Sequence, residues 1–246
     1  MLALISIIMI GFFLGMRHAT DPDHVIAVTT IVTQQRKLGR AALIGILWGL
    51  GHTLTILLVG CAIILFNVVI PARLGLAMEF SVSLMLVLLG GWNLASFTTS
   101  LPRMQPDRTV EPPRSHSHGP LVHTHEPAAE MPASTRFQLT RPLAVGIVHG
   151  LAGSAAVALL ILATIRDSRW AVAYLLVFGL GTVAGMMLIT MSIASAFRVI
   201  GDRFRLFGRN LALISGVISV GFGLLLAYQI GIVQGLFGSH PHWTPR

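Results

Sequence analysis

The chain has 246 residues, of which 54% are hydrophobic and only 11% are charged, whereas a soluble domain carries about 25% charged residues. This deficit excludes an ordinary soluble protein and predicts an integral membrane protein, most of whose surface faces lipid. The net charge of +8 does not predict a nucleic-acid partner, because the basic residues lie in short clusters between apolar runs, and the single cysteine, Cys61, excludes an internal disulfide or a multi-cysteine metal site.

Six apolar runs are long enough to cross a bilayer, which takes about 20 helical residues. We expect an all-α membrane protein with spans at residues 2–32, 41–69, 80–97, 142–165, 170–197 and 211–233. The chain then has four parts: a first membrane repeat at 1–97, a loop at 98–141, a second membrane repeat at 142–233 and a short tail at 234–246.

The first span is interrupted by a polar run, Arg17-His18-Ala19-Thr20-Asp21-Pro22-Asp23-His24. Pro22 has no backbone N–H, so the carbonyl of His18 loses its helical partner. In an unbroken helix, His18 and His24 would lie about 240° apart around the axis. We therefore predict that the first helix is broken at Pro22, which lets side chains from both sides of the break turn toward one point.

Ionisable side chains inside membrane spans cost several kcal/mol each and mark a functional site. Three of the predicted spans hold the candidate metal ligands, which are His18, Asp21, Asp23, His24, His52 and His149. Imidazole and carboxylate ligands suit divalent nickel, cobalt, copper and zinc better than magnesium or calcium. The sequence therefore predicts a transition-metal site inside the membrane.

Other roles are open to several of these groups. Each membrane histidine could form a structural hydrogen bond between helices, and His149 has no acid near it in the sequence. Asp21 could instead pair with Arg17 one turn away, which would leave Asp23 as the main carboxylate ligand.

The predicted loop at 98–141 is rich in proline and polar residues and cannot bury a core, so we expect it to be disordered. It carries four histidines, which are His116, His118, His123 and His125. These imidazoles could bind divalent metals weakly, or the loop could be a simple spacer.

The distribution of lysine and arginine predicts the orientation in the membrane. Twelve of these residues fall on one side of the predicted spans and only four, Arg73, Arg166, Arg169 and Arg246, on the other. Because the more basic side faces the cytoplasm, the His-rich loop is expected inside and both termini outside. The expected location is the plasma membrane, which is the inner membrane where a cell has two.

The two halves of the chain resemble each other at an offset of about 131 residues. Gly15-Met16-Arg17-His18-Ala19 aligns with Gly146-Ile147-Val148-His149-Gly150, Trp48-Gly49-Leu50-Gly51 with Phe178-Gly179-Leu180-Gly181, and Gly90 with Gly221. Each copy holds three spans, an odd number, so the copies must cross the membrane in opposite senses. Inverted repeats of this kind are a common transporter design, with the substrate site between the repeats near the middle of the bilayer.

These motifs resemble those of the nickel/cobalt transporter family. The family signature H-x4-D-H is matched by His18 to His24, and its leucine-glycine-histidine motif by Leu50-Gly51-His52. Residues 148–156 are similar to the branch of urease-accessory-like permeases. The resemblance implies uptake of nickel(II) or cobalt(II) as the transported ion, for enzymes such as urease and hydrogenase or for cobalamin. It also implies a cytoplasmic metallochaperone, or the proteins that mature urease and hydrogenase, as partners.

The chain departs from this family in two respects. Many members have eight spans, whereas six are expected here, with the usual first span absent. The His-rich loop is similar to the efflux branch of the superfamily, although that branch tends to have glycine where Asp23 stands. We therefore expect uptake, with efflux as the alternative.

Two other classes of protein are less consistent with the sequence. An intramembrane zinc protease needs H-E-x-x-H, which the chain lacks, so we expect no enzymatic activity and no resident cofactor. A membrane accessory protein that binds metal without moving it would have no need of an inverted repeat.

Overall fold

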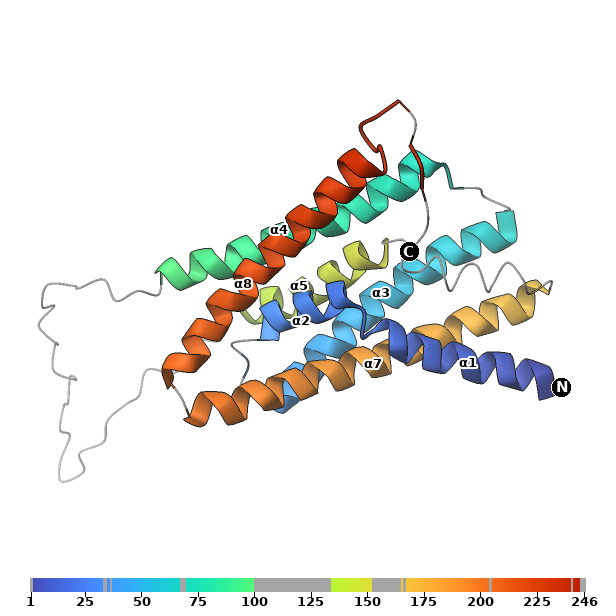
Figure 1. Ribbon diagram of the computed structural model, residues 1–246. Coiled ribbons are helices and arrows are strands. Elements are labelled where there is room, and N and C mark those ends of the chain that lie inside the picture. The colour runs from blue at the N-terminus through green and yellow to red at the C-terminus, as the bar shows by residue number, and fades with distance from the viewer. Residues whose placement is uncertain are drawn as a thin grey trace, which may run out of the picture.

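The computed structural model describes residues 2–32, 35, 37–66, 70–99, 134–151, 165, 167–203, 205–239 and 241–243. Every regular element in these ranges is a helix (Figure 1). In chain order they are α1 (Leu2–His18), α2 (Pro22–Val32), α3 (Leu38–Phe66), α4 (Ala72–Thr99), α5 (Ser134–Gly150), α7 (Ser168–Arg203), α8 (Arg205–Tyr228) and the π-helix η1 (Gln229–Val233). The prediction of an all-α protein is confirmed for this part of the chain.

Four helical segments are long and apolar enough to cross a bilayer. They are Leu38–Phe66, Ala72–Ser96, Ser168–Val199 and Leu213–Val233, and Pro22–Val32 is a shorter apolar helix. The four correspond to the second, third, fifth and sixth predicted spans. Helix α4 begins at Ala72, earlier than the predicted start at residue 80. The prediction began later because Arg73 and Glu79 make the first turns of this helix less apolar than the rest. These apolar helices indicate a membrane protein.

The first predicted span is broken at Pro22, as expected. Helix α1 ends at His18 and α2 begins at Pro22, with a three-residue turn between them. Pro22 has no N–H to donate to the His18 carbonyl, which instead accepts a hydrogen bond from the backbone N–H of Asp21 at 3.1 Å. Pro22 is the first residue of α2, a position where a helix needs no backbone N–H. The break thus costs little hydrogen bonding.

The fourth predicted span differs from the structure at its start. Helix α5 begins at Ser134 rather than at residue 142, and Pro142 lies within it. Six of the eight residues 134–141 are polar or charged, so hydropathy alone excluded this stretch from the span. The helix ends at Gly150, where Leu151 donates its N–H to the Val148 carbonyl at 3.2 Å. His116, His118, His123 and His125 of the predicted loop, and residues 152–164, lie outside the described residues.

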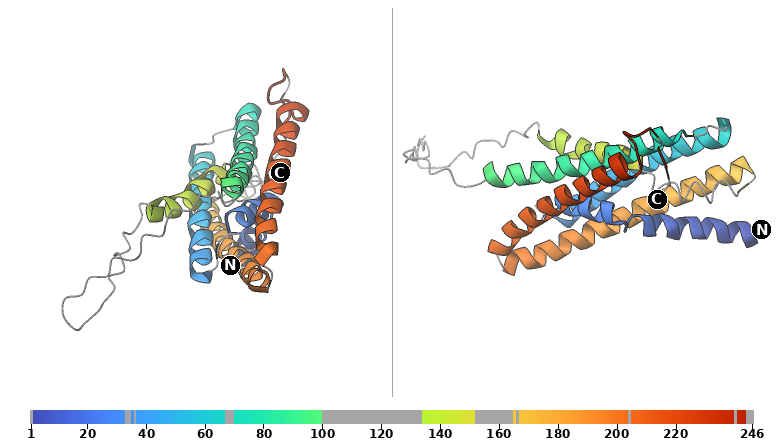
Figure 2. Two further views of the ribbon diagram at one scale, coloured as in Figure 1. Left: turned by 90° about the vertical axis from the view of Figure 1, so that its left-hand side faces the viewer. Right: turned by 45° about the horizontal axis from the view of Figure 1, so that its top comes forward.

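The helices form two groups that α2 connects (Figure 2). Helix α7 packs along both α1 and α3, and α3 also packs along α5. Helices α4 and α8 pair with each other, and α2 contacts both of them as well as α7. The short helix after the break therefore lies between the two groups.

Glycines allow the close approach of the helices in the first group. A Cβ atom at Gly15 of α1 would overlap the Phe178 carbonyl oxygen of α7, and one at Gly146 of α5 would overlap the Trp48 carbonyl oxygen of α3. The two contacts correspond to each other, because Gly15 aligns with Gly146 and Phe178 aligns with Trp48 when the two halves of the sequence are compared. Small residues at such contacts bring backbones together in membranes.

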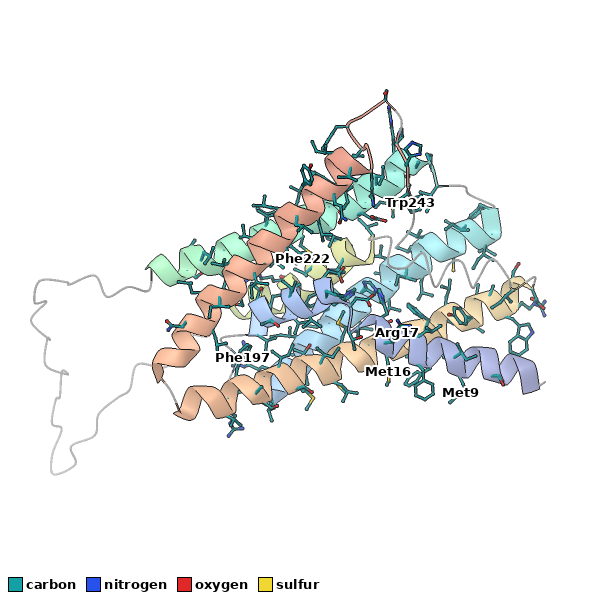
Figure 3. All side chains as sticks on the ribbon, viewed as in Figure 1. Met9, Met16, Arg17, Phe197, Phe222 and Trp243 are labelled. Atoms are coloured by element: carbon teal, nitrogen blue, oxygen red, sulfur yellow. The ribbon has the colours of Figure 1, made fainter. Side chains whose placement is uncertain are left out.

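The C-terminal segment folds back on the start of α4 (Figure 3). The indole N–H of Trp243 donates to Glu79 Oε1 at 2.9 Å, and the Trp243 ring covers Gly75. This contact gives a partner to the buried Glu79 carboxyl group.

Candidate functional site

The candidate site lies where helices end inside the protein. Helix α1 ends at His18, α2 begins at Pro22 and α5 ends at Gly150, while α3 passes beside them with His52. In Figure 3, Arg17 is seen next to this break, midway along the helices. The carboxyl end of a helix carries a partial negative charge. Two such ends, those of α1 and α5, favour a cation here, whereas the amino end of α2 carries a partial positive charge.

The first half of the site joins α1 to α3. His18 and Asp21 are 2.8 Å apart between Nδ1 and Oδ2, and His18 Nε2 lies 2.9 Å from His52 Nε2. An ionised carboxylate can only accept a hydrogen bond, so the contact with Asp21 places the proton of a neutral His18 on Nδ1 and a lone pair on Nε2. That lone pair faces His52. Both imidazoles are buried, whereas the Asp21 side chain is 39% exposed.

The second half of the site centres on the carboxylate of Asp23. Its Oδ1 lies 3.1 Å from His24 Nδ1, and its Oδ2 lies 3.0 Å from His149 Nε2. The same Oδ1 accepts the backbone N–H of His24 at 3.0 Å. Asp23 therefore holds two rings from different helices, and both of these rings are fully buried.

Three buried ring nitrogens of this cluster have no hydrogen-bond partner within the described part of the chain: His24 Nε2, His52 Nδ1 and His149 Nδ1. A buried polar atom without a partner costs about 1–3 kcal/mol. A purely structural role would leave that cost uncompensated at three places. The hydrogen bonds of the cluster therefore do not satisfy all of its ring nitrogens, which favours a ligand-binding role over a purely structural one.

The ligand atoms fall into two groups, and each group is compact enough for one ion. His18, His24 and His52 can each offer an atom such that all three lie within 4.8 Å of one another. The same holds for Asp23, His24 and His149. His24 belongs to both groups, and its ring is 4.7 Å from that of His18 and 4.0 Å from that of His149, centre to centre.

The structure brings together all six residues that the sequence singled out. Five of them form the two groups, and Asp21 stands at the rim, against His18. Asp21 contacts His18 rather than Arg17, so the alternative pairing does not occur here. His149 gains its acid from another helix, through Asp23.

Two aromatic neighbours of the cluster were missed from the sequence, Trp48 and Phe178, and the ring centre of Phe178 lies 5.7 Å from that of His18. Trp48 is fully buried, with its ring centre 5.7 Å from that of His149 and 6.3 Å from that of His24. In the sequence, both aromatic residues stood out only as part of the glycine-rich repeat motifs, which predict helix packing and not proximity to a site.

Two known proteins are similar to this chain. The urease accessory protein UreH of Bacillus sp. (strain TB-90) is 39% identical over 235 residues, which are 95% of this chain and 96% of that protein. The chain belongs to the urease-accessory branch of the nickel/cobalt transporter family. The second is the chloroplast protein FOR GROWTH AND FERTILITY 1 of Arabidopsis thaliana, 26% identical over 87% of this chain and 56% of that protein. No protein-family profile and no solved structure matches the chain.

This membership confirms the resemblance to the nickel/cobalt transporter family that the sequence motifs indicated. The Bacillus relative is named as an accessory protein of urease and not as an enzyme. This agrees with the expectation that the chain has no enzymatic activity of its own. The family assignment relates the chain to nickel or cobalt, and both this assignment and the apolar helices indicate a membrane protein.

Proposed function

We propose that the protein transports a divalent transition-metal ion, nickel or cobalt, across the membrane by way of the histidine cluster. The observation that carries the proposal is the convergence of four buried imidazoles and one carboxylate at the ends of broken helices. Discontinuous helices present ligands in this way in many transporters. Urease is named in the Bacillus relative, and we infer that its maturation proteins, or a cytoplasmic metallochaperone, receive the ion.

The proposed ligands are His18, Asp23, His24, His52 and His149. Asp21 positions His18 from the rim of the site through their 2.8 Å contact. Three or four imidazoles with one carboxylate favour nickel and cobalt over magnesium and calcium. The 2.9 Å between His18 Nε2 and His52 Nε2 matches two ligands at a right angle, since atoms about 2.1 Å from one ion then lie about 3.0 Å apart. That angle suits square-planar or octahedral nickel.

The transport mechanism that we infer is alternating access between two inverted three-helix repeats. It is supported by paired contacts: Gly181 lies on the Phe12 carbonyl as Gly51 lies on the Leu143 carbonyl. In sequence, Phe12 and Leu143 stand about 131 residues apart, the offset of the proposed repeats. In this arrangement the ion site lies between the repeats, close to the axis that relates them.

Uptake is the direction that we propose, with both termini outside the cytoplasm and the His-rich loop inside. The charge distribution of the loops supports this orientation. The loop histidines would then meet the ion after its passage. Efflux by the same site is the alternative, because the site residues alone are compatible with either direction.

Metal transport by the purified protein tests the proposal. Proteoliposomes with a metal-sensitive dye inside should accumulate nickel or cobalt, and should not accumulate magnesium. Liposomes that contain the His242→Ala protein, in which an exposed histidine outside the cluster is removed, should behave like those of the wild type. Protein that binds nickel tightly in detergent but moves none in either direction would make it a metal-binding accessory protein instead.

A further inference from the structure

The two groups of ligand atoms meet at a single imidazole. His24 Nδ1 faces Asp23, at 3.1 Å from Oδ1, whereas Nε2 is buried and unpartnered within the described residues. Because Nδ1 faces Asp23, Nε2 is the His24 nitrogen left for a second set of ligands. The centre of the His24 ring lies 4.7 Å from that of His18 and 5.2 Å from that of His52, and His24 belongs to both groups of candidate ligands.

We propose that the transported ion occupies two positions in turn, on opposite edges of the His24 ring. Position one consists of His18, His52 and His24 Nε2. Position two consists of Asp23, His149 and His24 Nδ1. This inference rests on the proposed function, and it adds that the ion is passed across a single imidazole rather than held in one five-ligand site.

The chemistry of imidazole makes the two positions exclusive. A neutral imidazole has one nitrogen with a lone pair and one with a proton. When an ion is at position one, the His24 proton is on Nδ1 and is held by Asp23. When an ion is at position two, that proton is on Nε2, and His149 carries its own proton on Nδ1. Each protein molecule therefore holds one ion at a time in this cluster.

The two positions also differ in charge. Position one offers three neutral imidazoles, and position two adds the negative charge of Asp23. A divalent ion gains more from a carboxylate in a medium of low dielectric constant. Asp21 touches His18 and is 39% exposed, so position one lies nearer to the half-exposed rim. The ion would enter there and pass inward to the charged position.

Nickel binding and nickel transport together test this inference. The proteins compared are wild type, His52→Ala, His149→Ala, the double variant and the control His242→Ala. His52→Ala keeps the charged position two, so its nickel affinity should fall by less than about tenfold. His149→Ala keeps only the neutral position one and should lose more, and each single variant should still bind one ion. The double variant should lose more than about a hundredfold, because neither position is complete. Transport should be lost in both single variants.

The outcomes separate this inference from the proposed function. If each single variant loses affinity as severely as the double variant, the five ligands form one site and the two-position model is wrong. Two ions bound to the wild type at saturation would contradict it as well. If the wild type binds nickel and transports none, the proposed function fails instead. His52→Asn and His149→Asn, which fill the same space, replace the alanine variants if those do not elute as a single folded species.

Discussion

The carboxylate of Asp23 in α2 lies 3.0 Å from the ring of His149 in α5, although 126 residues separate them in the chain. The same carboxylate holds His24, its neighbour in sequence. One acidic group therefore connects the two halves of the protein at the candidate site. The rings of His24 and His149 are fully buried, away from water, so their hydrogen bonds to Asp23 hold them in orientation.

Replacing Asp23 with asparagine should weaken nickel binding by about 10- to 100-fold, since the amide keeps only one oxygen for two imidazoles. Equilibrium dialysis of the purified protein against nickel measures the change. Asp167→Asn is the matched control, because Asp167 is exposed and caps the start of α7 through its 2.9 Å contact with the Arg169 N–H, which asparagine can replace. Wild-type affinity in Asp23→Asn would remove Asp23 from the site.

Replacing Pro22 with alanine should lower the rate of nickel uptake by about tenfold or more, because a restored N–H favours a continuous helix and moves His18 away from His24. Thermal stability in detergent should stay the same or rise. Pro142→Ala is the control, since α5 is continuous through Pro142. An unchanged uptake rate in Pro22→Ala would show that the break has no part in transport.

Replacing Gly15 or Gly146 with alanine should destabilise the protein by about 1–3 kcal/mol, because the new methyl group meets the backbone of a neighbouring helix. The effect is read as a lower melting temperature. Gly91→Ala is the control, since a Cβ atom at Gly91 meets nothing within 4 Å and alanine favours a helix. Equal melting temperatures for all three variants would contradict the packing described for α1, α3, α5 and α7.

The features that local chemistry determines could be read from the sequence. The break at Pro22 follows from one missing N–H, and the long apolar helices follow from hydropathy. The start of α5 at Ser134 could not be read, because its first residues are polar. The contact between Asp23 and His149 was also hidden, since the sequence places no acid near His149 and only the packing of α2 near α5 supplies one.

The orientation of the chain in the membrane can be tested with reporters. A phosphatase domain, which is active only outside the cytoplasm, should be active when fused after Arg246 and inactive when inserted near Gly119. The reason is the excess of lysine and arginine on the side that carries the 98–141 segment. The reverse pattern would require an odd number of crossings or the opposite orientation.

Nickel uptake into proteoliposomes by the His24→Ala protein is the most direct test of transport through the histidine cluster, because His24 belongs to both groups of ligand atoms. The wild type and the His242→Ala control, reconstituted at equal amounts, should take up nickel at the same rate. The His24→Ala protein should take up none above the level of protein-free liposomes. Uptake by His24→Ala at the wild-type rate would contradict the account, since the ion would then cross the membrane without the histidine cluster.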